Sequence, residues 1–117
     1  AGLESRSPQR VVLSHKLAPE GWTGIGAPEE IATLAGVDWL LVEGGAETAA
    51  AFLRAGLVDQ LLLYRAPNLL GAGMAALGDI GLADLAAAHR RWRLTDTRML
   101  GIDRMESYQR IDAAYLA

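Results

Sequence analysis

The sequence predicts an α/β domain with a mostly parallel, buried sheet, flanking helices and a C-terminal antiparallel hairpin. Two nearly continuous apolar stretches, residues 37–43 and 58–67, have the composition of strands that are buried on both faces. Residues 46–55 between them have the spacing of an amphipathic helix. The chain ends in two partly alternating stretches, "RRWRLTDTRML" and "RMESYQRI", separated by "GID". That pattern is typical of a half-exposed antiparallel hairpin.

The bulk composition fits one small domain and excludes several classes of protein. The 117 residues, of which 51% are hydrophobic, suffice for one core but not for two domains. A net charge of −3 argues against a nucleic-acid binder. No stretch approaches the roughly 18 apolar residues of a membrane span, so we expect no membrane partner. The absence of cysteine excludes disulfides and thiolate metal sites and fits a cytoplasmic location.

The first third of the chain carries short elements. Residues 1–9 are polar and predict a flexible lead-in, so that a single domain occupies residues 10–117. Residues 10–14, "RVVLS", predict a strand, and the glycine-rich residues 15–26 predict a loop with a brief strand around Trp22. Residues 27–36 predict a short helix that begins at Pro28 and ends at Gly36. Its apolar face comprises Ile31, Leu34 and Ala35.

Residues 37–67 predict a strand–helix–strand unit. Ala49, Phe52 and Leu53 form the inner stripe of the helix, and Gly56 suits a left-handed helix exit. If the two strands are adjacent and parallel, the crossover is right-handed; the sequence leaves their direction open. Residues 68–85 contain four glycines and predict a loop with one helical turn near residues 82–85. In the following strand, Trp92 and Leu94 share one face.

A carboxylate and two glycines lie between the apolar stretch and the helix. Glu43, Gly44 and Gly45 directly precede the helix, whose first N–H groups have no intrahelical partner and carry the positive end of the dipole. Glycines let a phosphate approach this backbone, and the hydroxyl of Thr48 adds a donor. A plain strand-to-helix turn explains the same residues. No P-loop and no dinucleotide fingerprint is present.

Two further groups of residues carry no clear chemistry. His15 and His89 are the only histidines and have no metal-ligand spacing, so no metal site is expected. The basic run "HRRWR" at residues 89–93 is interpreted as the solvated start of a strand.

Several motifs in order resemble a known family, the reductase domain of the bifunctional riboflavin-biosynthesis deaminase/reductase, which is similar to dihydrofolate reductase in fold. The strand that precedes the apolar segment is "PQRVVLS" at residues 8–14, and the glycine turn is Glu43-Gly44-Gly45. The helix exit is Gly56-Leu57-Val58-Asp59, the strand end is Ala66-Pro67 and the leucine-glycine step is Leu69-Leu70-Gly71. The resemblance covers nearly the whole chain.

The resemblance implies NADPH-dependent reduction of a phosphorylated ribosylamino-pyrimidine, 5-amino-6-(5-phosphoribosylamino)uracil, to its ribityl form. It implies a cofactor site at the turn and a substrate contact at Glu43. The implied cofactor-binding residues are Gly44, Gly45, Ala46, Glu47 and Thr48 for the pyrophosphate, and Ser14 and Lys16 for the 2′-phosphate. The implied partners are a small-molecule substrate and further copies of the chain, as a homo-oligomer. No catalytic residue is assigned.

The chain also departs from the family pattern. The family's reductase domain carries a further segment before "PQRVVLS", with a central strand and much of the substrate pocket, so residues 10–117 resemble a partial domain. Two alternatives therefore stay open. One is another dihydrofolate reductase-like reductase with a pterin or pyrimidine substrate. The other is a non-catalytic α/β module that oligomerises through its hairpin and open sheet edges.

Overall fold

The computed structural model describes residues 4–111, and these divide into two compact units. The first unit ends at Gly44 and the second begins at Gly45. In chain order the elements are η1 (Glu4–Arg6), β1 (Val11–Leu13), β2 (Thr23–Ile25), η2 (Pro28–Thr33), α1 (Ala46–Arg54), β3 (Gln60–Arg65), η3 (Ala86–Ala88), β4 (Trp92–Leu100) and β5 (Asp103–Arg110). None of the helices in this described part is long and apolar enough to cross a membrane.

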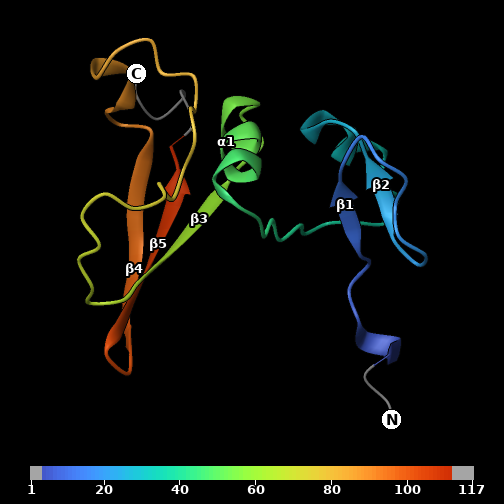
Figure 1. Ribbon diagram of the computed structural model, residues 1–117, viewed down its shortest axis with the longest axis horizontal. Helices are drawn as coiled ribbons and strands as arrows, with labels where there is room; N and C mark the ends of the chain where they lie inside the picture. The colour runs from blue at the N-terminus through green and yellow to red at the C-terminus, as the bar shows by residue number, and fades with distance from the viewer. Residues whose placement is uncertain (1–3, 112–117) are drawn as a thin grey trace. The chain divides into compact units, whose positions relative to one another are not determined.

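The first unit is built on a two-stranded parallel sheet. β1 and β2 pair from Val11↔Thr23 to Leu13↔Ile25, and both strands predicted here are thereby confirmed (Figure 1). Backbone bonds from Thr23 N to Arg10 O and from Ser14 N to Ile25 O, both 2.9 Å, extend the ladder at either end. Ile25 is the buried residue of this sheet. The polar lead-in contains the 3₁₀ turn η1, and its first three residues lie outside the described residues.

The helix predicted over residues 27–36 is a shorter 3₁₀ helix, η2. Pro28 stands at its start, and the side chain of Glu30 accepts a hydrogen bond from Gly26 N at 3.0 Å. The turn ends at Leu34, whose backbone is extended, and Gly36 follows in the left-handed conformation with φ 69°. Ile31 and Leu34 are half-buried but Ala35 is exposed, because the helix ends at Thr33 and Ala35 lies beyond its cap residue Leu34.

The strand predicted over residues 37–43 is absent, and this prediction is wrong. Trp39 and Leu41 are 90% and 74% exposed, although the apolar run predicted burial on both faces. A strand exists only when a neighbour completes its ladder of N–H and C=O groups. No strand among residues 4–111 pairs with this segment, so its backbone remains extended coil.

The second unit contains a three-stranded antiparallel sheet in the order β3-β5-β4 (Figure 1). β3 pairs with β5 from Gln60↔Gln109 to Arg65↔Arg104. The predicted hairpin is confirmed as β4–β5, with Gly101 at its turn in the left-handed conformation. β5 is half-exposed, as predicted, whereas β4 is exposed at all its positions except Trp92 and Asp96.

The expectation of a mostly parallel buried sheet is wrong for residues 4–111. One strand pair is parallel and two are antiparallel. β3 alternates between half-buried and exposed positions rather than being buried on both faces. β3 pairs with the returning hairpin strand β5, and no described strand pairs with residues 37–43.

Helix α1 closely follows its prediction. Gly56, with φ 69°, ends it in a Schellman motif, in which Leu57 N donates to Phe52 O and Gly56 N to Leu53 O, each at 3.1 Å. Phe52 and Ala50 are buried, while the other predicted stripe residues, Ala49 and Leu53, are half-buried.

The loop after β3 is irregular, as predicted, but its helical turn lies at Ala86–Ala88 rather than at residues 82–85. The carboxylate of Asp84 accepts a hydrogen bond from Ala87 N at 2.9 Å, which starts the turn two residues beyond that aspartate. An earlier part of the same loop contacts α1, because the guanidinium of Arg54 donates to the backbone carbonyl of Asp79.

A bulge in β4 gives the sheet an internal polar contact. The pairing with β5 shifts between Leu94 and Asp96, so Thr95 is the extra residue. The hydroxyl of Thr95 donates to the backbone oxygen of the buried Ser107 at 3.1 Å. Gln60 Nε2 donates to Ser107 Oγ at 2.8 Å, so the polar side chain in the middle of β5 is satisfied. Trp92 and Leu94 pair with alternate residues of β5 and share a face, as predicted.

A buried carboxylate holds two arginines on the sheet. Arg65 and Arg104 are directly paired across β3 and β5, and Glu106 lies next to both. Its carboxylate is 2.9 Å from Nη2 of Arg104 and 3.6 Å from Nε of Arg65. Tyr108 donates its hydroxyl to the same carboxylate at 2.9 Å. Without Glu106, two like charges would face each other across the strands.

We expect Glu106→Gln to lower the pKa of Tyr108. The hydrogen bond to Glu106 holds the pKa of the phenol above 10.0, and desolvation and the charge of Glu106 act in the same direction. Because the folded pKa is raised, this contact adds stability below pH 10.0 that disappears as the pH rises through the folded value. The Tyr108 pKa of both proteins is measured by following tyrosine ring-carbon chemical shifts through a pH titration. An unchanged Tyr108 pKa in the variant would contradict this assignment.

Candidate functional site

The N-terminus of α1 presents free amide groups. Gly45 is the N-cap, with φ −76° and ψ −178°, and no side chain caps the helix. The carbonyl of Gly45 accepts the first helical bond, from Ala49 N at 3.1 Å. The amides of Ala46, Glu47 and Thr48 therefore precede the hydrogen-bond ladder, and no backbone partner for them occurs within residues 4–111. Three donors and the positive end of the helix dipole make this an anion-binding geometry.

Gly45 keeps the approach to these amides open. A Cβ built on Gly45 would meet no atom within 4 Å. Its φ is one that any residue adopts, so the chain's own backbone does not require glycine here. The glycine leaves space, and space next to unpaired amides suits a ligand that contacts the backbone directly.

Gly78, which sequence reasoning missed, closes the other side of the first helical turn. Its N–H donates to Ala46 O at 3.1 Å, and a Cβ on it would lie 2.6 Å from Oε1 of Glu47. Any larger residue would displace the loop or the Glu47 side chain. The only sequence signal was the glycine content of the loop, which does not indicate what each glycine contacts.

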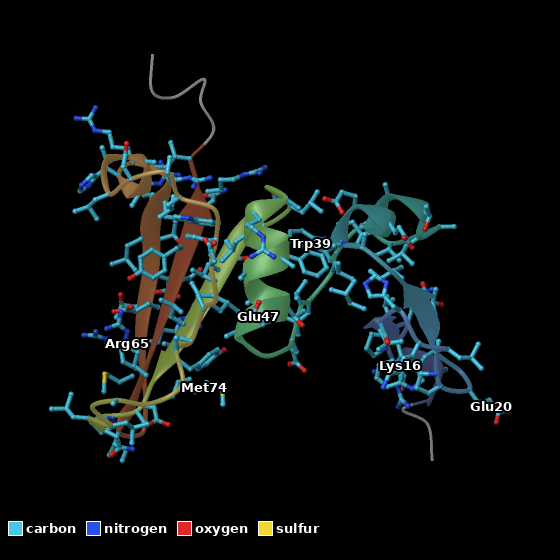
Figure 2. All side chains as sticks on the ribbon, turned by 45° about the horizontal axis from the view of Figure 1, so that its top comes forward. Lys16, Glu20, Trp39, Glu47, Arg65 and Met74 are labelled. Carbon is cyan, nitrogen blue, oxygen red and sulfur yellow. The ribbon has the colours of Figure 1, made fainter. Side chains whose placement is uncertain are left out.

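Glu47 is the acidic residue of the first turn, and Figure 2 labels it on α1. Its carboxylate lies against Gly78 and stabilises the positive helix end. An anion at this terminus would therefore use the Glu47 amide as a donor while its carboxylate stays turned to the loop.

The structure brings Ser14 and Lys16 together in the first unit. Lys16 N donates to Ser14 Oγ at 3.0 Å, which forms a tight turn at the end of β1. The ammonium of Lys16 has no ion pair with the residues from 4 to 111, and its side chain is exposed (Figure 2). A hydroxyl and a cation two residues apart suit a phosphate group.

The remaining candidates, Glu43 and Gly44, belong to the first unit, and both are exposed. The expected position of Glu43 at a strand end is wrong, because residues 37–43 form no strand. The structure defines Ser14, Lys16, Glu43 and Gly44 within one unit and Gly45 to Thr48 within the other.

The structure is a small α/β fold, and the helix terminus at Gly45 has an anion-binding geometry. The family described as the RibD C-terminal domain matches residues 25–104, which is more than half of the chain. The chain therefore belongs to the RibD C-terminal domain family, as the sequence motifs predicted.

Relatives and a solved structure agree with this assignment. "Riboflavin biosynthesis protein RibD" of Mycobacterium tuberculosis is 41% identical over 64 residues, which are 55% of this chain and 19% of that protein. The protein of the same name from Escherichia coli is 40% identical over 68 residues, 57% of this chain and 18% of that protein. The chain thus matches about a fifth of the length of these relatives. The structure of Acinetobacter baumannii RibD, form 2, matches 89% of this chain and 38% of that chain, with a TM-score of 0.53 and 24% identity, which supports the fold.

Proposed function

We propose that this chain is part of a reductase that uses NADPH to open the ribose of 5-amino-6-(5-phosphoribosylamino)uracil to the ribityl form, in riboflavin biosynthesis. Membership of the RibD C-terminal domain family is the observation that carries this proposal. The curated relatives are named for riboflavin biosynthesis. We further propose that the domain to which this chain belongs has a dihydrofolate reductase-like fold.

The free amides at α1 fit the pyrophosphate of the cofactor. Ala46, Glu47 and Thr48 supply N–H donors, and the open space at Gly45 admits the phosphate oxygens, with Gly44 proposed to assist from the preceding residue. The Thr48 hydroxyl adds a donor on the same turn. NADPH supplies the hydride, and the protein contributes binding and orientation. Glu43 is the proposed substrate contact; its carboxylate accepts hydrogen bonds from ribose hydroxyls or pyrimidine N–H groups.

Ser14 and Lys16 are proposed to select NADPH over NADH. Their turn offers a hydroxyl and an ammonium, both donors to a 2′-phosphate that NADH lacks. We also propose a homo-oligomer in the cytoplasm. The exposed apolar residues of segment 37–42 support association, and the absence of cysteine fits that compartment.

The first test is a calorimetric titration of this chain with NADPH and NADH, repeated on a version extended at the N-terminus to the length of the relatives. We expect the extended version to bind NADPH preferentially and to reduce the substrate. In Lys16→Gln, the preference for NADPH over NADH should fall about ten-fold, because one charge-assisted bond is lost. Glu20→Gln, a neutralised exposed charge in the same loop, is the control (Figure 2).

The same titration separates the rival functions. Cofactor binding without reduction of this substrate would indicate another reductase of the same fold. If the extended version binds neither cofactor, the chain is a non-catalytic module and the proposal fails.

A further inference from the structure

A hollow at the C-terminal end of α1 has no role in the proposed reduction. It has a volume of about 250 Å³ and lies between the helix exit, the start of β4 and the end of β5. The backbone closes part of it, since Ile111 N donates to Arg91 O and Arg110 N to Asp59 O, each at 2.9 Å. Helix α1 separates it from the amides at Gly45, which lie at the opposite end of the helix.

The lining of this hollow is apolar and incompletely covered. Its apolar side chains come from α1, the loops and the ends of β4 and β5, and all are half-buried: Leu53, Val58, Ile80, Trp92 and Ile111. Each therefore keeps apolar surface in contact with water, and a ligand that covers this surface gains the hydrophobic contribution of its burial. The volume lies just below the ~300–1,000 Å³ of sites for drug-sized ligands, so it fits a single ring.

The rim of the hollow is strongly basic. Arg110 is already engaged, with Nη2 2.8 Å from Oδ1 of Asp59 and a second bond to the carbonyl of Gly56. His89, Arg90 and Arg91 also line the hollow, and within residues 4–111 their side chains have no ion pair with a carboxylate. Among the described residues, the carboxylate of Asp59 pairs with Arg110 and with neither of the other two arginines. Complementing the negative helix end explains Arg110 but not the two arginines that directly precede β4.

The backbone at this rim is strained. Arg90 has φ 58°, the only positive φ of a non-glycine residue in the described part of the chain. A bulky residue rarely adopts this strained conformation, and such residues are concentrated at ligand-binding positions. The conformation sends the chain from the turn at His89 into β4 and keeps Arg90 on the rim of the hollow.

We propose that this hollow is a second binding site, for a small single-ring molecule that carries a phosphate or carboxylate. The ring covers Trp92 and its apolar neighbours. The anionic group is held by Arg90 and Arg91, and planar guanidinium groups suit either anion through paired hydrogen bonds. The site is separate from the cofactor amides, so a bound molecule would not compete with the proposed cofactor.

Phenyl phosphate is the probe for this site, followed by the indole N–H signals of the three tryptophans in NMR spectra of the full chain. Single Trp→Phe variants assign the signals. Only Trp92 lines the hollow, whereas Trp22 and Trp39 belong to the first unit and act as internal controls. We expect phenyl phosphate to shift the Trp92 signal in a saturable way. Phenol, which lacks the charge, should bind about ten-fold more weakly, and inorganic phosphate should leave Trp92 unshifted.

Variants of Arg90 and Arg91 test the basic rim of the hollow. In Arg90→Asn/Arg91→Gln, phenyl phosphate should bind about ten-fold more weakly, and asparagine tolerates the positive φ of position 90. If this double variant does not fold, Arg90→Asn alone serves. Arg93→Gln is the control, since Arg93 lies close in sequence, on β4, but bonds to Gln109 outside the hollow. An unshifted Trp92, an equal response to inorganic phosphate, or equal weakening by Arg93→Gln would each overturn the proposal.

Discussion

Gly45→Val should weaken NADPH binding by about 100-fold, or ~2.7 kcal/mol, without unfolding the chain. The structure indicates why the substitution affects cofactor binding and not folding. The Cβ of the valine would meet no atom of the protein within 4 Å, and φ −76° is allowed for it. Its methyl groups would instead fill the space in front of the Ala46 and Glu47 amides, where phosphate oxygens are proposed to bind. Calorimetric titration of the N-terminally extended version measures the affinity.

Two controls accompany this substitution. Valine is a poorer N-cap than glycine, so a loss of stability of up to about 1 kcal/mol is expected and is measured by thermal melting. Gly73→Val is the matched control, because its Cβ would make only ordinary contacts, at 3.6 Å or more, with Leu70. Unchanged affinity in Gly45→Val would show that these amides do not bind the cofactor and would favour the plain turn.

Phe52→Ala should destabilise the second unit by about 3–5 kcal/mol. Phe52 is the only phenylalanine of the chain, and its exposure is 4%. It is the one large side chain among the buried residues of this unit that the structure describes, the others being Ala50, Glu106 and Ser107. A small domain has a total stability of about 5–15 kcal/mol, so this loss leaves little. Urea unfolding followed by the fluorescence of Trp92, in a background with Trp22 and Trp39 replaced, measures it.

Leu69→Ala is the control for Phe52→Ala, since Leu69 is fully exposed in the loop after β3. Its expected effect is within about 0.5 kcal/mol. Equal effects of the two substitutions would mean that Phe52 does not anchor the packing of this unit.

The elements that the sequence predicted correctly are those with local causes. Helix α1 has its periodicity and Gly56 within eleven residues, and the hairpin has its turn at Gly101 between two alternating stretches. Residues 37–43 have equally strong strand composition but no strand. No strand among residues 4–111 pairs with this segment, and a strand depends on its neighbour as much as on its own sequence.

In the candidate site, too, the features with local causes were predicted from the sequence and the others were not. The motif led to Gly45 and to the amides that follow it, because a helix terminus is defined by consecutive residues. Gly78 could not be predicted, because its contact with Ala46 and Glu47 spans about thirty residues and depends on the path of an irregular loop. The carboxylate that joins Arg65 to Arg104 likewise depends on the register between β3 and β5.

The exposed segment 37–42 also affects the tendency of the chain to aggregate. "WLLV", at residues 39–42, combines high β-propensity with no charge and no proline, the composition of segments that stack into cross-β fibrils. Asp38 and Glu43 stand at its two ends as charged gatekeepers, which oppose stacking of identical copies. Keeping these two carboxylates ionised during purification, with a low protein concentration, should therefore hold the chain in dispersed form.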